Sequence, residues 1–130
     1  MAYEIPKKVL SLICGAVSLA AMQYHFVKLS ADNTVVICSG TTDVPVGVLQ
    51  NDPGIGEAAE ILVYGVSKLM VGAAGDLTYG LAVGVDADGH AVSSLVTDTT
   101  CYNVGRVLEG AGSGALCVAS INCLNPVRNA

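Results

Sequence analysis

The chain of 130 residues is 52% hydrophobic and only 13% charged, and its formal net charge is −5. The length fits one domain. Six scattered Lys and Arg residues are too few for a phosphate-binding surface, so we expect no nucleic-acid partner. This composition is apolar for a small domain, which indicates that part of its surface is buried against other copies.

The first eight residues are polar and precede the first apolar run. Pro6 keeps the residue before it extended, and two apolar side chains at strand spacing stand beside a pair of lysines. We therefore expect residues 1–8 to form an extended arm that binds a partner, residues 9–124 a single β-barrel domain, and residues 125–130 a C-terminal tail. The candidate binding residues of the arm are Tyr3, Ile5, Lys7 and Lys8.

The same region also has features of a signal peptide. Lys7 and Lys8 are followed by the apolar run VLSLICGAVSLAA, which imitates the charged and apolar regions of such a leader. Against this, Glu4 lies in the leading region, Gly15 interrupts the run, and no A-x-A cleavage site follows. The run is also shorter than the roughly 20 apolar residues of a membrane-spanning helix, so we expect no membrane partner. A secreted β-domain for adhesion or carbohydrate binding, with a cleaved signal peptide, is the alternative.

From Val9 onward the sequence predicts short strands separated by turns. Residues 15–22 form a connection with room for one helical turn, and residues 95–102 form an exposed loop. No segment after Met22 has a helical period over ten residues, which predicts an all-β fold, a small partly open barrel or sandwich. The predicted strands are Val9 to Cys14, Tyr24 to Leu29, Thr34 to Cys38, Val44 to Leu49, Ile61 to Met70, Leu81 to Val85, His90 to Ser94, Val104 to Glu109 and Leu116 to Leu124.

The strand from Ile61 to Met70 is apolar on both of its faces. An antiparallel strand with one solvated face alternates apolar and polar residues, so both faces of this strand must be covered. A neighbouring subunit, or a bent part of the same barrel, provides the second cover. We therefore take three residues of this strand as candidates for an oligomer interface, namely Leu62, Tyr64 and Val66.

The spaced carboxylates of Asp86 and Asp88 invite comparison with a calcium-binding loop. An EF-hand loop needs a glycine at its sixth position and a glutamate at its twelfth, where this chain has Ala91 and Thr97. We therefore expect a hairpin turn and no metal ion. A second glycine-rich segment, Gly110 to Gly114, lacks the spacing of a dinucleotide-binding fingerprint and precedes a strand, so it is predicted as a turn as well.

The five cysteines are odd in number and contain no C-x-x-C pair, which indicates buried free thiols rather than disulfides or a zinc site. Neither His25 nor His90 belongs to a recognisable nucleophile motif. A small hydrolase with a Cys and a His brought together by folding stays a rival hypothesis. The sequence itself indicates no catalytic residue and no cofactor, so we expect a protein that is not an enzyme.

Three segments together resemble a known family. They are VGVLQNDPGIGEAAEILVYGVSKLMVG, AAGDLTYGLAVGVDADGHAV and NVGRVLEGAGSGALCVASI, and their order is similar to that in small tailed-phage proteins that decorate or cement the capsid. The resemblance implies a glycine-rich β-barrel on the outer surface of a virion, assembled in the host cytoplasm. It also implies two partners: the major capsid protein and the protein itself, as a homotrimer or alternatively a homodimer.

Overall fold

The computed structural model describes residues 8–73, 75–94, 101–124 and 126–128, and all regular structure in these ranges is β. The all-β prediction is thus confirmed, and residues 15–22 form a connection without a helical turn. Among the described residues there is no helix that could cross a membrane. The strands are β1 Lys8–Cys14, β2 Phe26–Ala31, β3 Thr34–Ile37, β4 Gly47–Leu49, β5 Ala58–Met70, β6 Ala82–Val85, β7 Ala91–Ser93, β8 Tyr102–Asn103, β9 Gly105–Glu109, β10 Leu116–Asn122 and β11 Val127–Arg128.

The first five strands close into a barrel in the order β1-β3-β2-β4-β5, because β1 also pairs with β5. The β1–β5 contact is antiparallel and runs from Lys8 opposite Tyr64 to Ile13 opposite Ala58. The β1–β3 contact is parallel and begins only at Ile13. The predicted hairpin of β2 and β3 is present, with Asn33 in the left-handed conformation at its turn (φ 55°). The barrel expected from the sequence is therefore confirmed, and its ring is closed.

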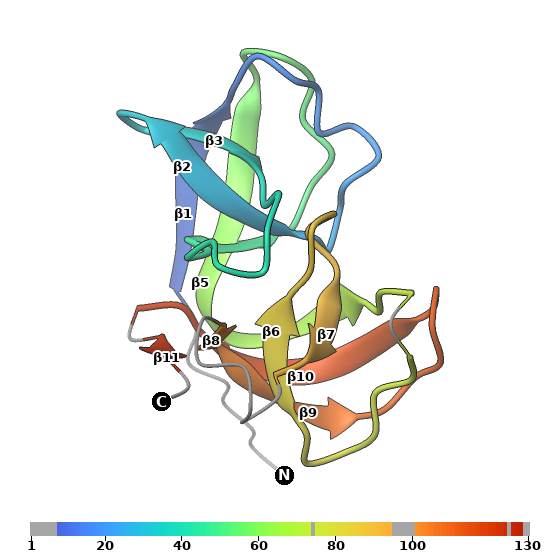
Figure 1. Cartoon of the computed structure of the whole chain (residues 1–130). Helices are drawn as coiled ribbons and strands as arrows, with labels where there is room; N and C mark the ends of the chain where they lie inside the picture. The colour runs from blue at the N-terminus through green and yellow to red at the C-terminus, as the bar shows by residue number, and fades with distance from the viewer. Residues whose placement is uncertain (1–7, 74, 95–100, 125, 129–130) are drawn as a thin grey trace, which may run out of the picture.

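The long strand β5 continues past the barrel and carries a second sheet (Figure 1). Its second half pairs with β10, and the order continues through β9, β6 and β7. β8 and β11 form a separate two-stranded sheet beside it. Gly65 has a positive φ of 136° where β5 passes from one sheet to the other, a conformation that glycine adopts without steric cost.

Two apolar cores lie on opposite sides of the barrel wall. The inner core fills the barrel and contains Cys14, Leu19, Val27, Val35, Leu49, Ala59 and Ile61. The outer core lies between the wall and the second sheet, and it includes Phe26, Val48, Leu62, Leu69, Val83, Cys117, Ala119 and Ile121. Adjacent residues of β2, β4 and β5 therefore face different cores, as side chains of a strand must. The two apolar faces of β5 are covered by the same chain, the bent-barrel alternative of the sequence prediction.

The turn between β6 and β7 fixes the second sheet to the barrel. Phe26 N donates to Gly89 O (2.8 Å), and Gly89 has a φ of 78°. A Cβ atom at this position would lie 2.5 Å from Ile37 Cδ1. Only a glycine allows this close approach of the turn to β2 and β3.

The strand β2 begins two residues later than predicted. Tyr24 has a φ of 68°, which interrupts the extended backbone before Phe26. Its N–H donates to Leu49 O (2.7 Å), and its carbonyl accepts from Met70 N (3.1 Å). The backbone of Tyr24 thus links the barrel strand β4 to the end of β5, which holds a conformation that costs free energy in a residue with a side chain.

Candidate functional site

The predicted interface residues of β5 separate into two groups. Leu62 is 2% exposed and belongs to the outer core, so it does not reach the surface and leaves the set of interface candidates. Tyr64 and Val66 are half-buried and alternate with inward residues of the second sheet. They remain candidates for contact with another molecule.

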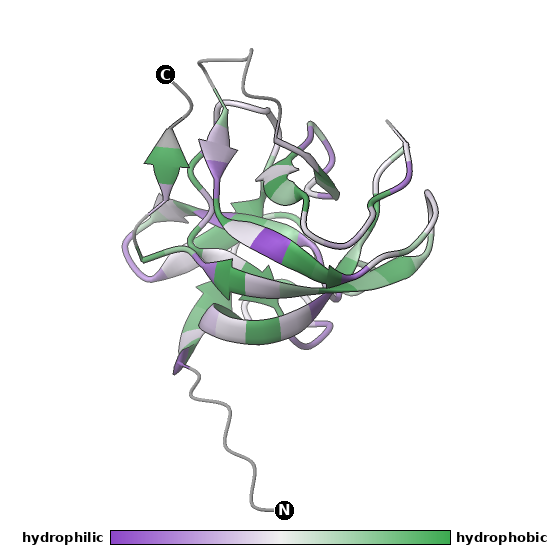
Figure 2. Cartoon of the chain, turned by 90° about the horizontal axis from the view of Figure 1, so that it is seen from below, coloured by the Kyte–Doolittle hydropathy of each residue, from purple (hydrophilic) through white to green (hydrophobic). Residues whose placement is uncertain are grey.

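Tyr64 and Val66 belong to an outward sheet face formed by β5, β10 and β9. Cross-strand partners share a face, and the partners of Tyr64, Val66, Lys68 and Met70 on β10 are Asn122, Ser120, Val118 and Leu116. On β9, Arg106 lies opposite Ser120 and Glu109 opposite Val118. The opposite face of these strands holds the buried residues Leu69, Cys117, Ala119 and Ile121. Figure 2, seen from below, shows apolar and polar stretches alternating along the strands.

Three cations stand on this face among apolar side chains. Lys68 and Arg106 are exposed, and Lys8 at the start of β1 pairs with Tyr64. Lys68 Nζ lies 5.9 Å from the centre of the Tyr24 ring. Leu116 next to them is 41% exposed. We call this surface the basic face, defined by Lys8, Lys68 and Arg106 with Val66, Met70, Leu116 and Val118.

One end of the basic face is hollowed by an open depression of about 270 Å³. Its lining includes Asn103, Arg106, Ser120 and Asn122. Arg106 Nη1 donates to Gly80 O (2.7 Å), which leaves other donors of its planar guanidinium for a ligand. An arginine in an open, polar hollow suits a carboxylate that projects from a partner.

The arm predicted to bind a partner falls mostly outside the described residues. Tyr3, Ile5 and Lys7 lie outside them. Lys8 is exposed, and it is the first residue of β1 rather than the last of the arm. This cation therefore belongs to the basic face.

The two histidines, 65 positions apart in sequence, lie together where the turn of β6 and β7 meets the barrel. Their ring centres are 4.7 Å apart. His25 is 6% exposed, and its Nδ1 donates to Gln23 O (3.1 Å). Burial lowers the pKa of His25, and the nearby His90 lowers it further, against the opposing effect of the Gln23 carbonyl. No local sequence signal indicates this pair, because it forms only when the second sheet folds onto the barrel.

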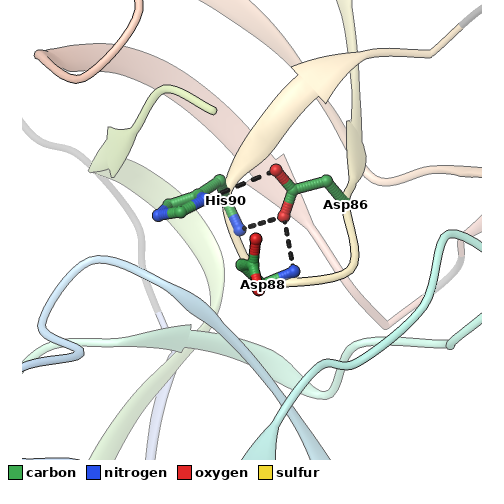
Figure 3. A group of neighbouring side chains, drawn as sticks. All are labelled: Asp86, Asp88 and His90. Atoms are coloured by element: carbon green, nitrogen blue, oxygen red, sulfur yellow. Dashed lines mark hydrogen bonds and ion pairs between the residues drawn. The ribbon is translucent and has the colours of Figure 1, made fainter. Parts of the chain in front are cut away.

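The hairpin turn predicted after β6 is present, and the carboxylate of Asp86 organises it (Figure 3). Asp86 Oδ1 accepts from Asp88 N (2.8 Å) and His90 N (2.9 Å), and Asp86 Oδ2 lies 3.4 Å from His90 Nδ1. One ligand atom from each of these three residues lies within 4.8 Å of the others. However, both Asp86 oxygens already have protein donors, and the other ring nitrogen of His90 points away from the carboxylates. The geometry is that of a hairpin turn.

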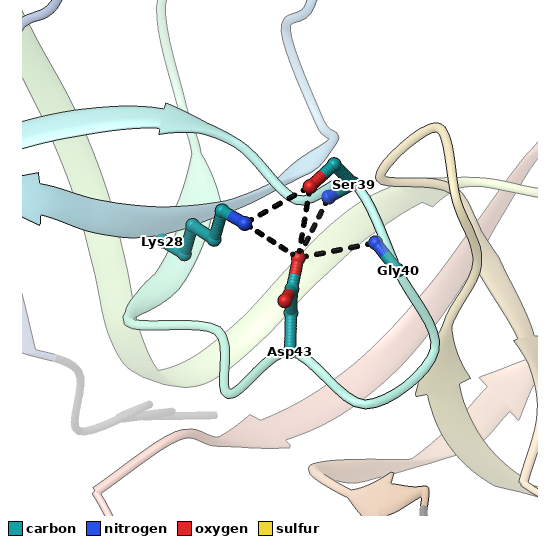
Figure 4. Close-up of polar contacts among 4 residues, drawn as sticks. All are labelled: Lys28, Ser39, Gly40 and Asp43. Atoms are coloured by element: carbon teal, nitrogen blue, oxygen red, sulfur yellow. Dashed lines mark hydrogen bonds and ion pairs between the residues drawn. The ribbon is translucent and has the colours of Figure 1, made fainter.

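A second carboxylate organises the loop after β3 (Figure 4). Asp43 Oδ2 accepts from Lys28 Nζ (2.9 Å), Ser39 N (2.8 Å) and Gly40 N (3.1 Å). Burial alone raises the pKa of Asp43, but these hydrogen bonds, with Lys28 first among them, hold it below its ordinary value. Lys28 is thereby paired with a carboxylate of the same chain.

Cys14, Cys38, Cys117 and Cys123 are buried free thiols, and Cys101 is half-buried. The prediction of buried free thiols is confirmed for these four. Burial raises the pKa of Cys38 and of Cys123 to about 12, and it raises the pKa of Cys117 as well. Thiols with such pKa values are protonated at neutral pH, and a protonated thiol is a poor nucleophile.

The protein has an all-β fold in which a closed five-stranded barrel extends into a second sheet through its longest strand. Solved structures of phage head proteins share it. The N base of the head fibre gp8.5 of bacteriophage phi29 superposes with a TM-score of 0.67, covering 91% of this chain and 96% of that chain at 18% sequence identity. A chain in the capsid of the Myoviridae phage XM1 gives a TM-score of 0.64 over 90% of this chain and 84% of that chain, at 19% identity.

No family model and no curated protein matches the sequence. The likeness to the two phage structures therefore rests on the fold. It extends over nine-tenths of the chain and includes both the barrel and the second sheet. The resemblance to phage head proteins that the sequence indicated is confirmed at this level.

Proposed function

We propose that the protein is a structural component of a bacteriophage virion that decorates and cements the capsid by binding the shell of major capsid protein. The observation that carries this proposal is the shared fold with a phage head fibre base and a phage capsid chain over about 90% of the residues. We place the protein on the outer surface of the capsid, after assembly in the host cytoplasm. The proposed binding involves no nucleic acid, membrane, cofactor or metal.

The proposed mechanism is association. Apolar surface buried between copies and against the shell stabilises the particle by roughly 25 cal/mol per Å², less the cost of ordering the partners. The basic face supplies half-buried apolar side chains for the contacts between copies, including Val66 and Met70. We further propose that the protein forms a homo-oligomer, a trimer or alternatively a dimer, through the face that carries Tyr64 and Val66.

We assign shell binding to the arm, through Tyr3, Ile5 and Lys7, with Lys8 at its junction with β1. The apolar residues provide anchors and the lysines attract an acidic surface during encounter. A variant that begins at Lys8 retains β1 complete and tests this assignment directly. We expect it to keep the β-sheet circular dichroism and the oligomeric state, and to lose co-sedimentation with capsids that lack the protein.

A matched control retains the whole arm but removes its anchors, as Tyr3→Ala with Ile5→Ala. Loss of binding in this variant assigns the interaction to those side chains, whereas loss only in the truncated protein assigns it to Lys7 and the backbone of the arm. Undiminished co-sedimentation of the truncated protein would refute the arm hypothesis. If the intact protein does not bind such capsids at all, the cement function itself is wrong.

The same proposal describes a protein without catalytic activity. The raised pKa values of three buried thiols support it, because a catalytic cysteine requires a lowered one. Alkylation of the folded protein with iodoacetamide tests this point against the hydrolase hypothesis. We expect slow reaction of Cys38, Cys117 and Cys123 at pH 7, and rapid alkylation of any one of these three would contradict it.

A further inference from the structure

Two surfaces of this protein carry an excess of charge of opposite sign. The basic face carries Lys8, Lys68 and Arg106, and Glu109 is the one acidic residue that the strand register places on it. Lys28, by contrast, is paired with Asp43. A protein with a net charge of −5 thus presents a face with an excess of positive charge.

The opposite end of the barrel has the complementary character. Asp32 lies in the turn between β2 and β3, and Asp52 and Glu57 lie in the loop before β5; all three are exposed. The segments 15–23, 30–33 and 50–57 that form this end contain no lysine or arginine. We call it the acidic end, defined by Asp32, Asp52 and Glu57 with Ile13 and Ile55.

Hydrogen bonds bring the parts of the acidic end together. Ile13 N donates to Asn33 O (2.8 Å), and the following residue, Cys14, donates to Glu57 O (2.9 Å). β1 therefore ends between the acidic turn of β2 and β3 and the acidic loop before β5. Two large apolar side chains of these segments are exposed, Ile13 at 49% and Ile55 at 65%. In Figure 1 this end forms the upper part of the molecule, and β9 and β10 lie at the bottom.

We propose that the basic face binds the acidic end of a second copy of this chain in a head-to-tail contact. Lys68 and Arg106 of one copy then face Asp32 and Asp52 of the next, and apolar side chains stand between charges on both surfaces. The hollow beside Arg106 receives a carboxylate of the neighbouring acidic end. The inference rests on the proposed self-association and specifies its two surfaces.

The charge pattern also determines which symmetry this contact allows. A two-fold contact places the same surface of both copies together, so it would oppose the lysines and arginine of one basic face with those of the other. Like charges brought together at an interface strongly disfavour the contact. A contact between two different surfaces avoids this repulsion, and it generates a closed ring, such as a trimer, or an open filament according to the rotation between copies.

Charge reversal on each surface tests the proposal. We expect the variants Lys68→Glu/Arg106→Glu and Asp32→Lys/Asp52→Lys each to raise the dissociation constant at least about 100-fold, because like charges then meet at the contact. The variant that combines all four substitutions keeps the net charge of −5 and restores opposite charges. We expect it to recover the wild-type association to within about tenfold, measured by sedimentation velocity.

The acidic-end variant separates this contact from a general charge effect. It brings the net charge closer to zero, so a general reduction of repulsion would strengthen association, whereas the proposed contact predicts weaker association. For the basic face, Lys68→Gln/Arg106→Gln is matched by Thr41→Glu/Thr42→Glu, which changes the net charge equally on an exposed loop. Only the first of these is expected to weaken association, and circular dichroism verifies that each variant is folded.

The possible outcomes distinguish this inference from the proposals on which it rests. If the wild-type protein is a monomer at micromolar concentration, self-association is wrong and the head-to-tail contact falls with it. If the wild type associates but neither charge-reversed variant weakens it, copies meet through other surfaces and only the inference is overturned. The same holds if both variants dissociate but the combined variant stays monomeric. Capsid binding is measured separately, so neither result bears on the cement function.

Discussion

The inner and outer cores differ in what encloses them. The inner core is enclosed by the barrel alone and contains seven buried residues, whereas the outer core contains sixteen and needs both the barrel wall and the second sheet. Phe26, Val48 and Leu62 point out of the barrel, and without the second sheet they would be exposed to solvent. The second sheet is therefore required to cover the barrel and is more than an extension of it.

This difference indicates that the two halves unfold together. The wall strands β2, β4 and β5 contribute neighbouring side chains to the two cores, so loss of either core exposes apolar surface of the same strands. Small single domains usually unfold in one cooperative transition. Substitutions on the two sides of the wall test whether that holds for this chain.

The largest effect is expected for Leu62→Asp compared with Tyr64→Asp. Leu62 is 2% exposed in the outer core, and an unpaired carboxylate there is so unfavourable that we expect no native β-sheet circular dichroism. Tyr64 is half-buried on the basic face, so Tyr64→Asp should remain folded and weaken association instead. A folded Leu62→Asp protein would show that the outer core is accessible to water.

A pair of truncations compares the two cores more quantitatively. We expect Phe26→Ala in the outer core to lower the free energy of unfolding by about 3–5 kcal/mol, and Leu49→Ala in the inner core by about 2–5 kcal/mol. Both should show a single transition in urea by fluorescence and circular dichroism. Leu29→Ala is the control, because Leu29 is 54% exposed, and it should change stability by less than about 0.5 kcal/mol. Two separate transitions in either core variant would contradict joint unfolding.

Local sequence patterns predict most of the strands but not their arrangement. The β-rich runs between glycine and aspartate turns identified β5 and the hairpin of β2 and β3, because alternation and turn residues are local properties. The pairing of β1 with both β3 and β5, which closes the barrel, joins segments far apart in sequence. No local pattern indicates which distant strand is the neighbour.

The sequence likewise predicts the candidate site only in part. The two apolar faces of β5 indicated two covers, but sequence alone does not show whether the chain or a partner provides each. Leu62 was assigned to a partner and lies in the outer core, while Tyr64 lies on the surface. The pairing of His25 with His90 had no sequence signal, because it depends on the turn of β6 and β7 docking on the barrel.

An intermediate effect is expected where that turn meets the barrel. Gly89→Ala places a Cβ 2.5 Å from Ile37 Cδ1 and 2.9 Å from Phe26 O, and it also forces a side chain onto a φ of 78°. Gly56→Ala is the matched control, because Gly56 has a φ of 77° and open space around it. The backbone conformation alone costs about 1–2 kcal/mol. We expect Gly56→Ala to lower the free energy of unfolding by about that amount, and Gly89→Ala to lower it clearly more, as measured by chemical denaturation. Equal decreases would show that the turn does not pack tightly.

The smallest effect is expected from pH, through the histidine at the same junction. Burial lowers the pKa of His25 from its ordinary 6.5, so the unfolded chain binds a proton at this residue before the folded chain does. Stability is therefore lost as the pH falls from 6.5 through the pKa of the folded state.

The lowered pKa of Asp43 also makes stability fall with falling pH, but only below 3.8. A series of thermal melts between pH 7.5 and 5 thus separates the effect of His25 from that of Asp43. We expect the melting temperature of the wild type to decrease over this range and that of His25→Gln to decrease less, with Asp43→Asn following the wild-type slope there. If His25→Gln keeps the full slope, protonation of this residue does not affect the junction between the barrel and the second sheet.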